Sequence, residues 1–546
     1  GFDRFEQYVL GTEDGIPKTP QWASPLCGIP VPTIRALARA WASKKTSIVH
    51  LEGGGMIRSA YATEPARLEV LLLAMQGVGK PGVHQLRMSR VGLPGDLFTP
   101  NLRAAYKGYD AEVSDLPKQI IPKTLIPDAI LNPPVNWYGT TLFPAPVEDQ
   151  FVAHTYPADG CSEIHMIWTD SPCWTTCWNG GNRMVEAMRS PKIEFVLAQH
   201  PWLENDCLLS DVILPVNTKL EEEDIGADFH GGQYRLVFPE QKCIDPLGES
   251  RSDYEIVCLI AEKLGVLNEY TGGKSITEWI RHGFETSGVQ EHISFEELKE
   301  KGYYVCPLDP DWGQQPVGIS AFYQDPEGNP LKTPSGKIEF YAQNLADHFP
   351  GDDERPPVPH WIPYGESHQE SLLHPRAESY PLILVSNHPR WRVHAQLDDV
   401  TWFREIPTCK VRGPDGYMYE PVWINPVDAT ERGIKDGDVV SVFNERGSVL
   451  GGAYVTERVM PGVILQDHGA RYDPIVPGEI DRGGDNNTIC PHKVTSKHAA
   501  GEVTSGFLVQ IERADTGELM KKYPEAFKRD YDPAAGPLLS SWIDES

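Results

Sequence analysis

Residues 163–216 read EIHMIWTDSPCWTTCWNGGNRMVEAMRSPKIEFVLAQHPWLENDCLLSDVILPV, and this stretch decides the fold. Residues 164–168 and 193–197 are short runs rich in β-branched, aromatic and other apolar side chains, and residues 183–188 between them have the polarity of a crossover helix. A third apolar run, residues 211–215, follows after a short polar segment. A strand, a helix, and two further strands in this order predict a parallel sheet.

Polar residues follow the first two predicted strands. Thr169, Asp170, Ser171 and Pro172 come after the first, and the sequence 199–201, Gln-His-Pro, comes after the second. Ligands of open parallel sheets bind beyond the carboxyl ends of the strands, so these turns suit the sugar, base or phosphates of a nucleotide. Ordinary turns favour the same residue types, and the spacing leaves both interpretations open.

The composition limits the class of protein. A chain of 546 residues predicts three or four domains at about 150 residues each. A net charge of −28 argues against a nucleic acid or an anionic membrane as partner, because both require clustered Lys and Arg. The chain contains no run of eighteen apolar residues, so we expect no membrane-spanning helix. It begins Gly-Phe-Asp without an initiator Met or a signal peptide, and we interpret it as a fragment whose beginning is missing.

Ten cysteines are scattered over the chain without a C-x-x-C pair. This pattern argues against an iron–sulfur or structural zinc site within the chain. We expect reduced thiols, which are compatible with a cytoplasmic location.

A glycine-rich loop interrupts the N-terminal part. Residues 1–45 are predicted as a helical connection, residues 47–51 as a strand, and residues 64–75 as an amphipathic helix, with Gly53, Gly54 and Gly55 after the strand. This order is that of a phosphate cradle, but neither G-x-G-x-x-G nor G-K-[ST] is present, so the motif is weak by itself.

The remaining chain divides by composition. Residues 46–216 form the predicted dinucleotide-binding α/β domain, in which residues 83–160 are an insertion rich in Pro and aromatic residues that either shapes an active-site entrance or is a plain surface loop. We predict a second α/β portion and linker at 217–375, where residues 221–224, Glu-Glu-Glu-Asp, favour a solvated helix start over a metal site and residues 335–340 favour a turn entering a strand. Several short strands around one small helix predict a closed β-barrel at 376–515, before a tail at 516–546.

A resemblance rests on several separated motifs. Asn425-Pro426-x-Asp428-Ala429 followed by Gly433-Ile434-x-Asp436-Gly437-Asp438 resembles the C-terminal double-psi barrel of molybdopterin oxidoreductases of the dimethyl-sulfoxide-reductase family. Residues 28–38, 73–82, 206–215 and 335–339 resemble further motifs of that family, in the same order. The resemblance implies an α/β fold with Rossmann-like parallel-sheet domains followed by a double-psi β-barrel. Within the family, residues 13–20 and 58–64 look most like the large subunits of pyrogallol–phloroglucinol transhydroxylase and resorcinol hydroxylase.

What the resemblance implies is a bis(molybdopterin guanine dinucleotide) cofactor with molybdenum or tungsten. Three groups of residues would bind it: at one pterin Gly54, Gly55, Met56, Ile57, Arg58 and Ser59; at one guanosine Thr169, Asp170, Ser171, Pro172, Gln199, His200 and Asp206; at the other pterin and its nucleotide Ser386, Asn387, His388, Arg390, His394, Asn486 and Asn487. For His388 and His394, structural hydrogen bonding within a barrel loop is an equally open interpretation. The metal ligand is expected upstream of Gly1, and iron–sulfur centres in a separate small subunit.

The resemblance also implies an activity. We expect an oxidoreductase that transfers hydroxyl groups between polyhydroxylated benzenes in anaerobic aromatic degradation, with Tyr61 contacting the ring and His and Tyr side chains moving phenolic protons. The alternatives are a reductase or dehydrogenase of an oxyanion or sulfur compound, and a cofactor-free structural subunit of an electron-transfer complex.

Overall fold

The computed structural model describes residues 1–50, 55–87, 119–139, 147–227, 236–307, 310–314, 316–398, 400–406, 408–497, 499–532 and 536–537. The chain forms two compact units. Unit 1 comprises residues 1–56, 63–117 and 217–361, and unit 2 comprises residues 57–62, 118–216 and 362–546. Among the described residues, no helix is both long and apolar enough to cross a membrane.

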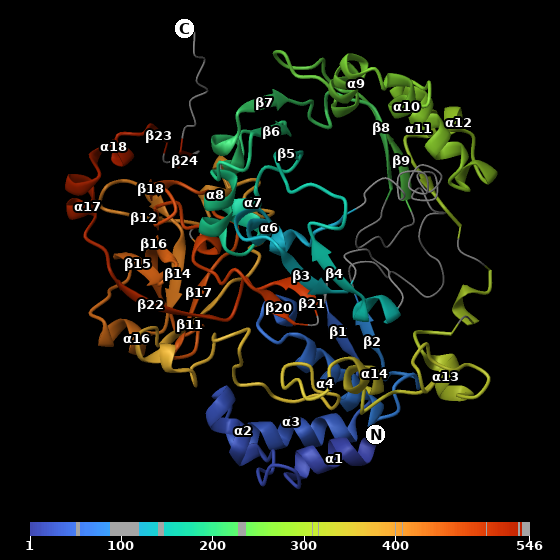
Figure 1. The fold of residues 1–546 in the computed structure, drawn as a ribbon, viewed down its shortest axis with the longest axis vertical. Coiled ribbons are helices and arrows are strands. Elements are labelled where there is room, and N and C mark those ends of the chain that lie inside the picture. Colours follow the sequence, from blue (N-terminus) through green and yellow to red (C-terminus); the bar gives the residue numbers. More distant parts are fainter. Residues whose placement is uncertain are drawn as a thin grey trace. The chain divides into compact units, whose positions relative to one another are not determined.

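A parallel sheet lies in the first half of unit 2, as the sequence predicts. Strands β5 (Met166–Thr169), β6 (Phe195–His200) and β7 (Val212–Pro215) pair in that order, all parallel. Helix α8 (Gly181–Met188) makes the crossover from β5 to β6 (Figure 1). The face of β5 and β6 that carries Ile167 and Val196 packs on Met184 of α8 and on Ile130 of α6 (Ile126–Leu131). The short helix α7 (Trp174–Cys177) lies between β5 and α8.

A closed barrel forms the second half of unit 2. Six strands follow one another in the order β14, β17, β11, β22, β15, β16, and β16 pairs back with β14 to close the ring. Their bounds are β11 (Leu382–Val385), β14 (Pro421–Ile424), β15 (Val439–Asn444), β16 (Gly447–Val455), β17 (Val463–Gln466) and β22 (Phe507–Arg513). Alternate side chains face inward, and Leu384, Val422, Ile464 and Phe507 are fully buried. Each contributes roughly 1.5–3 kcal/mol by leaving water. This confirms the predicted barrel.

Helix α16 (Pro426–Glu431) is the small helix that the sequence places within the barrel. The side chain of Asn425 accepts the N–H of Val427, and Pro426 occupies the first helical position, where its missing N–H costs nothing. Smaller elements complete unit 2: strands β3 (Val135–Tyr138), β4 (Ala153–Tyr156), β12 (Val411–Arg412), β13 (Met418–Tyr419), β18 (Pro474–Val476), β19 (Ile480–Asp481), β20 (Val494–Ser496), β21 (Ala499–Glu502), β23 (Tyr531–Asp532) and β24 (Gly536–Pro537), and helices α15 (Thr401–Arg404), α17 (Thr516–Lys522) and α18 (Pro524–Phe527).

Unit 1 is mainly helical. Its helices are α1 (Phe2–Leu10), α2 (Pro20–Cys27), α3 (Val31–Ser43), α4 (Thr63–Ala74), α9 (Asp253–Leu264), α10 (Leu267–Thr271), α11 (Ile276–Glu285), α12 (Phe295–Lys301), α13 (Ser320–Gln324) and α14 (Gln343–His348). Strands β1 (Ile48–His50) and β2 (Gln85–Arg87) pair in parallel, and β8 (Asp224–Ala227), β9 (Leu236–Glu240) and β10 (Tyr304–Val305) form an antiparallel sheet. Ser252, Ser275 and Ser294 begin α9, α11 and α12 with complete capping boxes.

Two local predictions in unit 1 are wrong. The acidic run at 221–224 does not start a helix: the Glu221 carboxylate accepts the N–H groups of Thr218 and Leu247, and Asp224 begins strand β8. Glu221 is 3% exposed, so its carboxylate accepts hydrogen bonds from the backbone of the turn instead of facing solvent. Residues 335–340 make the predicted turn, but no strand follows it.

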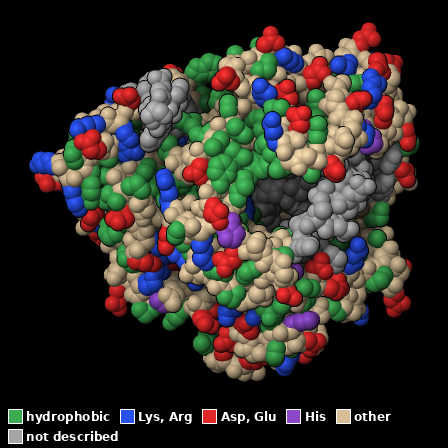
Figure 2. Space-filling model, turned by 45° about the horizontal axis from the view of Figure 1, so that its top comes forward, with side chains coloured by type: hydrophobic (Ala, Val, Ile, Leu, Met, Phe, Trp, Pro, Cys, Tyr) green, Lys and Arg blue, Asp and Glu red, His purple; other side chains and the backbone are tan. Residues whose placement is uncertain are grey.

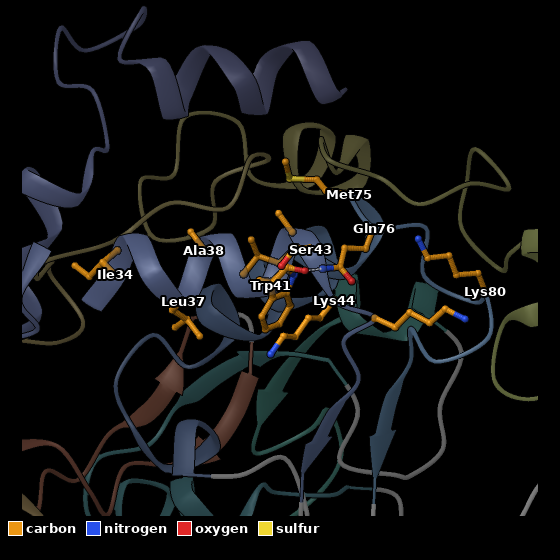
Figure 3. Close-up of a pocket in the computed structure, with 12 residues that line it drawn as sticks. Ile34, Leu37, Ala38, Trp41, Ser43, Lys44, Met75, Gln76 and Lys80 are labelled. Carbon is orange, nitrogen blue, oxygen red and sulfur yellow. Dashed lines mark hydrogen bonds between the residues drawn. The ribbon is translucent and has the colours of Figure 1, made fainter. Parts of the chain in front are cut away.

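Apolar side chains of α3, of α4 and of the residue that follows α4 line a groove in unit 1 (Figure 3). Leu37, Trp41, Leu72 and Met75 are among them. None of the lining residues belongs to the predicted cofactor site. Figure 2 shows acidic and basic side chains interspersed over the visible face, in keeping with a charge excess that is spread over the chain.

Candidate cofactor site

The segment after the glycine loop lies against the barrel in unit 2. The carbonyl of Arg58 accepts the N–H groups of Thr504 at 3.1 Å and Ser505 at 3.0 Å, and the Ser505 hydroxyl accepts the N–H of Ser386 at 3.1 Å. A Cβ at Gly506 would lie 3.4 Å from the Ser59 hydroxyl oxygen, so this serine faces the start of β22. The structure therefore places Arg58 and Ser59 of the first predicted group near Ser386 of the third.

The structure describes only part of the first group, residues 54–59. Gly54 lies outside the described residues, and only the backbone of Gly55 and Met56 is described, as the start of a 3₁₀ turn at Gly55–Arg58. Ile57 is exposed, and the Arg58 guanidinium lies 3.2 Å from the Glu502 carboxylate.

Tyr61 is buried within unit 2. Its backbone is left-handed, with φ at 56°, and its N–H donates to the Thr495 carbonyl at 2.7 Å. The hydroxyl donates to the carbonyl of His368 at 3.4 Å, and the ring contacts the His368 imidazole edge-on. In this arrangement the N–H and the hydroxyl of Tyr61 both donate to backbone carbonyls. Its catalytic role stays a prediction.

The turns after β5 and β6 meet at one edge of the parallel sheet. Trp168 donates its indole N–H to the Gln199 side chain at 3.2 Å, and a ring nitrogen of His200 lies 2.9 Å from the Asp170 carbonyl. The Ser171 N–H donates to the Thr169 hydroxyl at 3.1 Å. Because Thr169 and Gln199 are buried while Asp170 and Ser171 are exposed, the edge offers its polar groups on an accessible turn.

Asp206 fastens this turn to helix α7. Its N–H donates to the Pro172 carbonyl, and its carboxylate accepts the N–H groups of Trp174 and Thr175 and the Thr175 hydroxyl. Complete burial raises the pKa of this carboxyl to about 6, although the hydrogen bonds to Thr175 and Trp174 act against that rise. Protein donors occupy both carboxylate oxygens, and a contact with guanosine stays a prediction.

Three imidazoles form the centre of the third group. One ring nitrogen from each of His388, His394 and His468 lies within 4.8 Å of the other two, and Nδ1 of His394 lies 2.7 Å from Nε2 of His468. His468 is the residue that the sequence analysis missed. Its one signal was position, because it lies two residues beyond the carboxyl end of the barrel strand β17.

The two asparagines support the imidazoles. Asn486 donates its amide to the carbonyls of Gln466 and Asp467, and its oxygen lies 3.5 Å from the Ser386 hydroxyl. The Asn487 oxygen lies 3.2 Å from Nδ1 of His468, and its amide donates to the Thr176 carbonyl of α7 at 3.0 Å. Asn487 therefore links the imidazole cluster to helix α7.

Asn387 and Arg390 occupy the exposed part of the same loop. The Asn387 carbonyl accepts the N–H of His468 at 2.8 Å, and the Arg390 guanidinium lies 5.7 Å from the centre of the Trp391 ring. Loop 386–394 thus presents an amide, an imidazole and a guanidinium to solvent.

The three imidazoles are neutral, because burial and nearby cations lower their pKa values. Burial and Arg58 lower the pKa of His388, and burial, His388 and Lys123 lower that of His394 to about 4. Burial lowers the pKa of His468 well below its ordinary value. Neutral ring nitrogens beside guanidinium and ammonium groups suit a ligand that combines a polar heterocycle with phosphates.

Two further buried atoms fit a polar ligand in this region. Among the described residues, Oδ2 of Asp485 and Oε1 of Gln466 have no hydrogen-bond partner, although both side chains are fully buried. Such atoms are rare in folded proteins unless water or a ligand satisfies them. The ring nitrogens of the imidazoles and the exposed amide and guanidinium of loop 386–394 fit the heterocycles and phosphates of a pterin dinucleotide.

Two family models match parts of this chain. The family model described as molybdopterin oxidoreductase matches residues 152–263, and the one described as molydopterin dinucleotide binding domain matches residues 382–505. The first match spans the parallel sheet, and the second spans most of the barrel.

Individual relatives match almost the whole chain. The pyrogallol hydroxytransferase large subunit of Pelobacter acidigallici is 32% identical over 94% of this chain and 65% of its own length. The dimethyl sulfoxide/trimethylamine N-oxide reductase of Cereibacter sphaeroides is also 32% identical, over 94% of this chain and 60% of its own length. The solved structure of acetylene hydratase from Pelobacter acetylenicus aligns with a TM-score of 0.47 and 17% identity, over 65% of this chain and 45% of that one, which is too distant to bear on function.

This chain thus spans about two thirds or less of the relatives it matches. The two family models fall in the expected order on the parallel sheet and the closed barrel, and the chain belongs to the molybdopterin oxidoreductases of the dimethyl-sulfoxide-reductase family, which carry a molybdenum bis(molybdopterin guanine dinucleotide) cofactor.

Proposed function

We propose that this chain is the cofactor-binding part of a catalytic large subunit that transfers hydroxyl groups between polyhydroxylated benzenes, of the pyrogallol-to-phloroglucinol type. The observation that carries the proposal is the match to a pyrogallol hydroxytransferase over 94% of this chain. Because that relative is called a large subunit, we also propose a smaller partner, carrying iron–sulfur centres. A cytoplasmic location is part of the proposal, supported by ten cysteines without a disulfide.

The chain's own residues would bind the cofactor at two edges. Thr169–Pro172, Gln199, His200 and Asp206 would hold one guanosine at the sheet edge. At the barrel, loop 386–394 with Asn486 and Asn487 would hold the second pterin and its nucleotide, and residues 54–59 the first pterin. When bound, the molybdenum cofactor supplies the redox chemistry. His388, exposed and neutral, would accept a hydrogen bond from a phenolic O–H group in this environment.

A second candidate is a reductase of N-oxides or sulfoxides. It rests on the dimethyl sulfoxide/trimethylamine N-oxide reductase, which matches the same share of this chain at the same identity. The two reactions differ in electron demand. Pyrogallol and phloroglucinol are isomers, so their interconversion has no net redox change, whereas reducing an N-oxide or sulfoxide consumes two electrons and two protons.

The test uses the complete protein, purified anaerobically. Molybdenum, tungsten and guanine nucleotide are quantified first, and about two guanine nucleotides per metal are expected. The protein is then incubated with pyrogallol without a reductant, and with trimethylamine N-oxide plus reduced viologen. Formation of phloroglucinol supports the proposal, while viologen oxidation without phloroglucinol supports the reductase. Absence of metal and nucleotide contradicts both and leaves a structural subunit.

A further inference from the structure

A chain of hydrogen bonds in unit 2 ends at the exposed side of the imidazole cluster. It runs from the Thr176 carbonyl to the Asn487 amide, from the Asn487 oxygen to Nδ1 of His468, and from Nε2 of His468 to Nδ1 of His394. The three distances are 3.0, 3.2 and 2.7 Å. We call these four groups the histidine relay.

The direction of the histidine relay is fixed at its inner end. A carbonyl only accepts, so the Asn487 NH₂ group faces Thr176 and its oxygen faces His468. An amide oxygen also only accepts, so Nδ1 of His468 carries the proton. A neutral imidazole has one proton, and Nε2 of His468 is therefore an acceptor. Nδ1 of His394 must then be the donor to it, which leaves Nε2 of His394 with a lone pair.

The surroundings keep the rings of the histidine relay neutral. The charged groups that act on His394 are Lys123 and Arg58, and Arg392 acts on His468; one anion, Glu502, acts on the neighbouring His388. Extra protons on these rings would face three cations. Among the described residues, none hydrogen-bonds Nε2 of His394, and the residue is only partly buried.

We propose that Asn487 and His468 are positioning residues that make His394 present a hydrogen-bond acceptor, so that this point of the site takes the N–H or O–H edge of a heterocycle and not a phosphate oxygen. The ligand's identity rests on the proposed function, but the polarity of the histidine relay does not. The histidine relay thus assigns the heterocyclic end of the cofactor to His394. Its phosphates belong with the cations nearby.

The polarity is tested by ¹⁵N NMR of imidazole-labelled full chain, with His394 and His468 assigned from H394Q and H468Q. We expect both rings neutral, with the proton on Nδ1. Asn487→Ala removes the fixed acceptor, and both rings should shift toward mixed tautomers. Asn487→Asp keeps an acceptor and should keep Nδ1–H on His468. The control is Asn444→Ala, which removes a buried amide with two carbonyl acceptors elsewhere in the barrel and should leave both rings unchanged.

The ligand class is tested on the same labelled chain. Tetrahydropterin, which carries N–H groups, should shift the Nε2 signal of His394 without protonating it, and the shift should be lost in Asn487→Ala. Inorganic phosphate should leave the signal in place. A proton on Nε2 of His394 in the wild type, no change in Asn487→Ala, no response to tetrahydropterin, or protonation by phosphate would each overturn the inference. These outcomes do not depend on metal content or turnover, so they are distinct from failure of the proposed function.

Discussion

Gly469 allows His394 to approach His468. Its φ is +82°, and a Cβ at this position would lie 2.3 Å from the backbone carbonyl carbon of His394. His394 itself has φ at 52°, a conformation that residues with a side chain rarely adopt. Such backbone conformations persist where the surrounding structure holds them, and they gather at binding sites.

Replacing Gly469 by alanine should therefore separate the two rings. We expect Gly469→Ala to destabilise unit 2 by more than the roughly 1–3 kcal/mol of left-handed strain alone, because the new methyl group meets backbone. Thermal melting measures the loss, and the imidazole ¹⁵N signals report the broken contact. Gly462→Ala is the matched control, since Gly462 has φ at +81° with open space around it. Equal losses for the two variants would contradict the steric argument.

Arg392 holds the backbone beneath the imidazoles. Its guanidinium pairs with Glu420 at 2.8 Å and Asp398 at 3.1 Å and donates to the carbonyls of Asp467 and His468. Lys410 joins the same two carboxylates. All these ionic side chains are almost completely buried, so water cannot replace a lost partner.

Arg392→Met should cost about 3–5 kcal/mol, because it leaves buried carboxylates with fewer partners. Comparing melting temperatures with Arg281→Met separates burial from charge. The Arg281–Glu296 pair is exposed and screened by water, so its loss should leave the melting temperature almost unchanged. Similar melting temperatures for the two variants would show that the buried network contributes little.

The sequence predicted His388 and His394 but not His468, and the reason is distance along the chain. His468 is 74 residues from His394, and the parallel pairing of β11 with β17 brings the ends of these two strands together. Nothing in the local sequence 466–469 distinguishes a buried relay histidine from a turn residue. The structure contains the structural hydrogen bond that the alternative interpretation of His394 expects, at Nδ1. Among the described residues, none hydrogen-bonds Nε2 of the same ring.

At the scale of elements, α7 depends on a residue outside it. Four residues make too short a helix to be stable alone. The Asp206 carboxylate receives the N–H groups of Trp174 and Thr175 and so supplies the missing acceptor at the helix start. Because Asp206 also donates its N–H to the Pro172 carbonyl, this one residue ties the turn at 169–172 to α7.

The stability contribution of Asp206 should depend on pH. Burial raises its pKa from an ordinary 3.8 to about 6, so the folded state binds this proton more tightly than the unfolded state does. Its contribution is complete below about pH 4 and falls as the pH rises to about 6. Asp206→Asn stays uncharged, and the melting temperature of wild type minus that of the variant should fall between pH 4 and 6. A difference that grows over this range would mean that the carboxylate is stabilised as an anion.

Elements were predictable where the pattern was long and periodic. The strand–helix–strand order of 163–216 and the alternating runs of the barrel each repeat a signal over several elements, and both folded as expected. The acidic run at 221–224 failed because Glu221 found backbone donors at Thr218 and Leu247, and the second of these lies 26 residues away. A hydrogen bond to a carboxylate from a residue far along the chain leaves no trace in the sequence around that carboxylate.

At the scale of the whole molecule, the chain does not divide in sequence order. Residues 57–62 belong to unit 2, while the residues on both sides of them belong to unit 1. The ion pair between Arg58 and Glu502 spans 444 residues, a contact that composition and local pattern could not indicate. The linear domain boundaries of the sequence analysis stay a prediction.

This division predicts how the cofactor changes unfolding. Each unit has its own core, around Leu73 and Phe284 in unit 1 and around Leu384 in unit 2. All the predicted cofactor residues from Ile57 onward lie in unit 2. A ligand that binds only the folded state stabilises it by about 2.7 kcal/mol at a hundred times its Kd. Calorimetry should therefore show two transitions, of which loading with cofactor raises chiefly the one belonging to unit 2.

Two core variants assign the transitions before loading. Leu73→Ala and Leu384→Ala each remove a side chain with no exposed surface, at a cost of about 2–5 kcal/mol, and each should lower the transition of its own unit. The transition lowered by Leu384→Ala is then the one that cofactor must raise. If cofactor instead raises the transition lowered by Leu73→Ala, the bound group is held mainly by unit 1, and the assignment of both nucleotide edges to unit 2 is wrong. A single transition lowered equally by both variants would mean that the two units unfold together, because one cooperative transition requires that neither core survives the loss of the other.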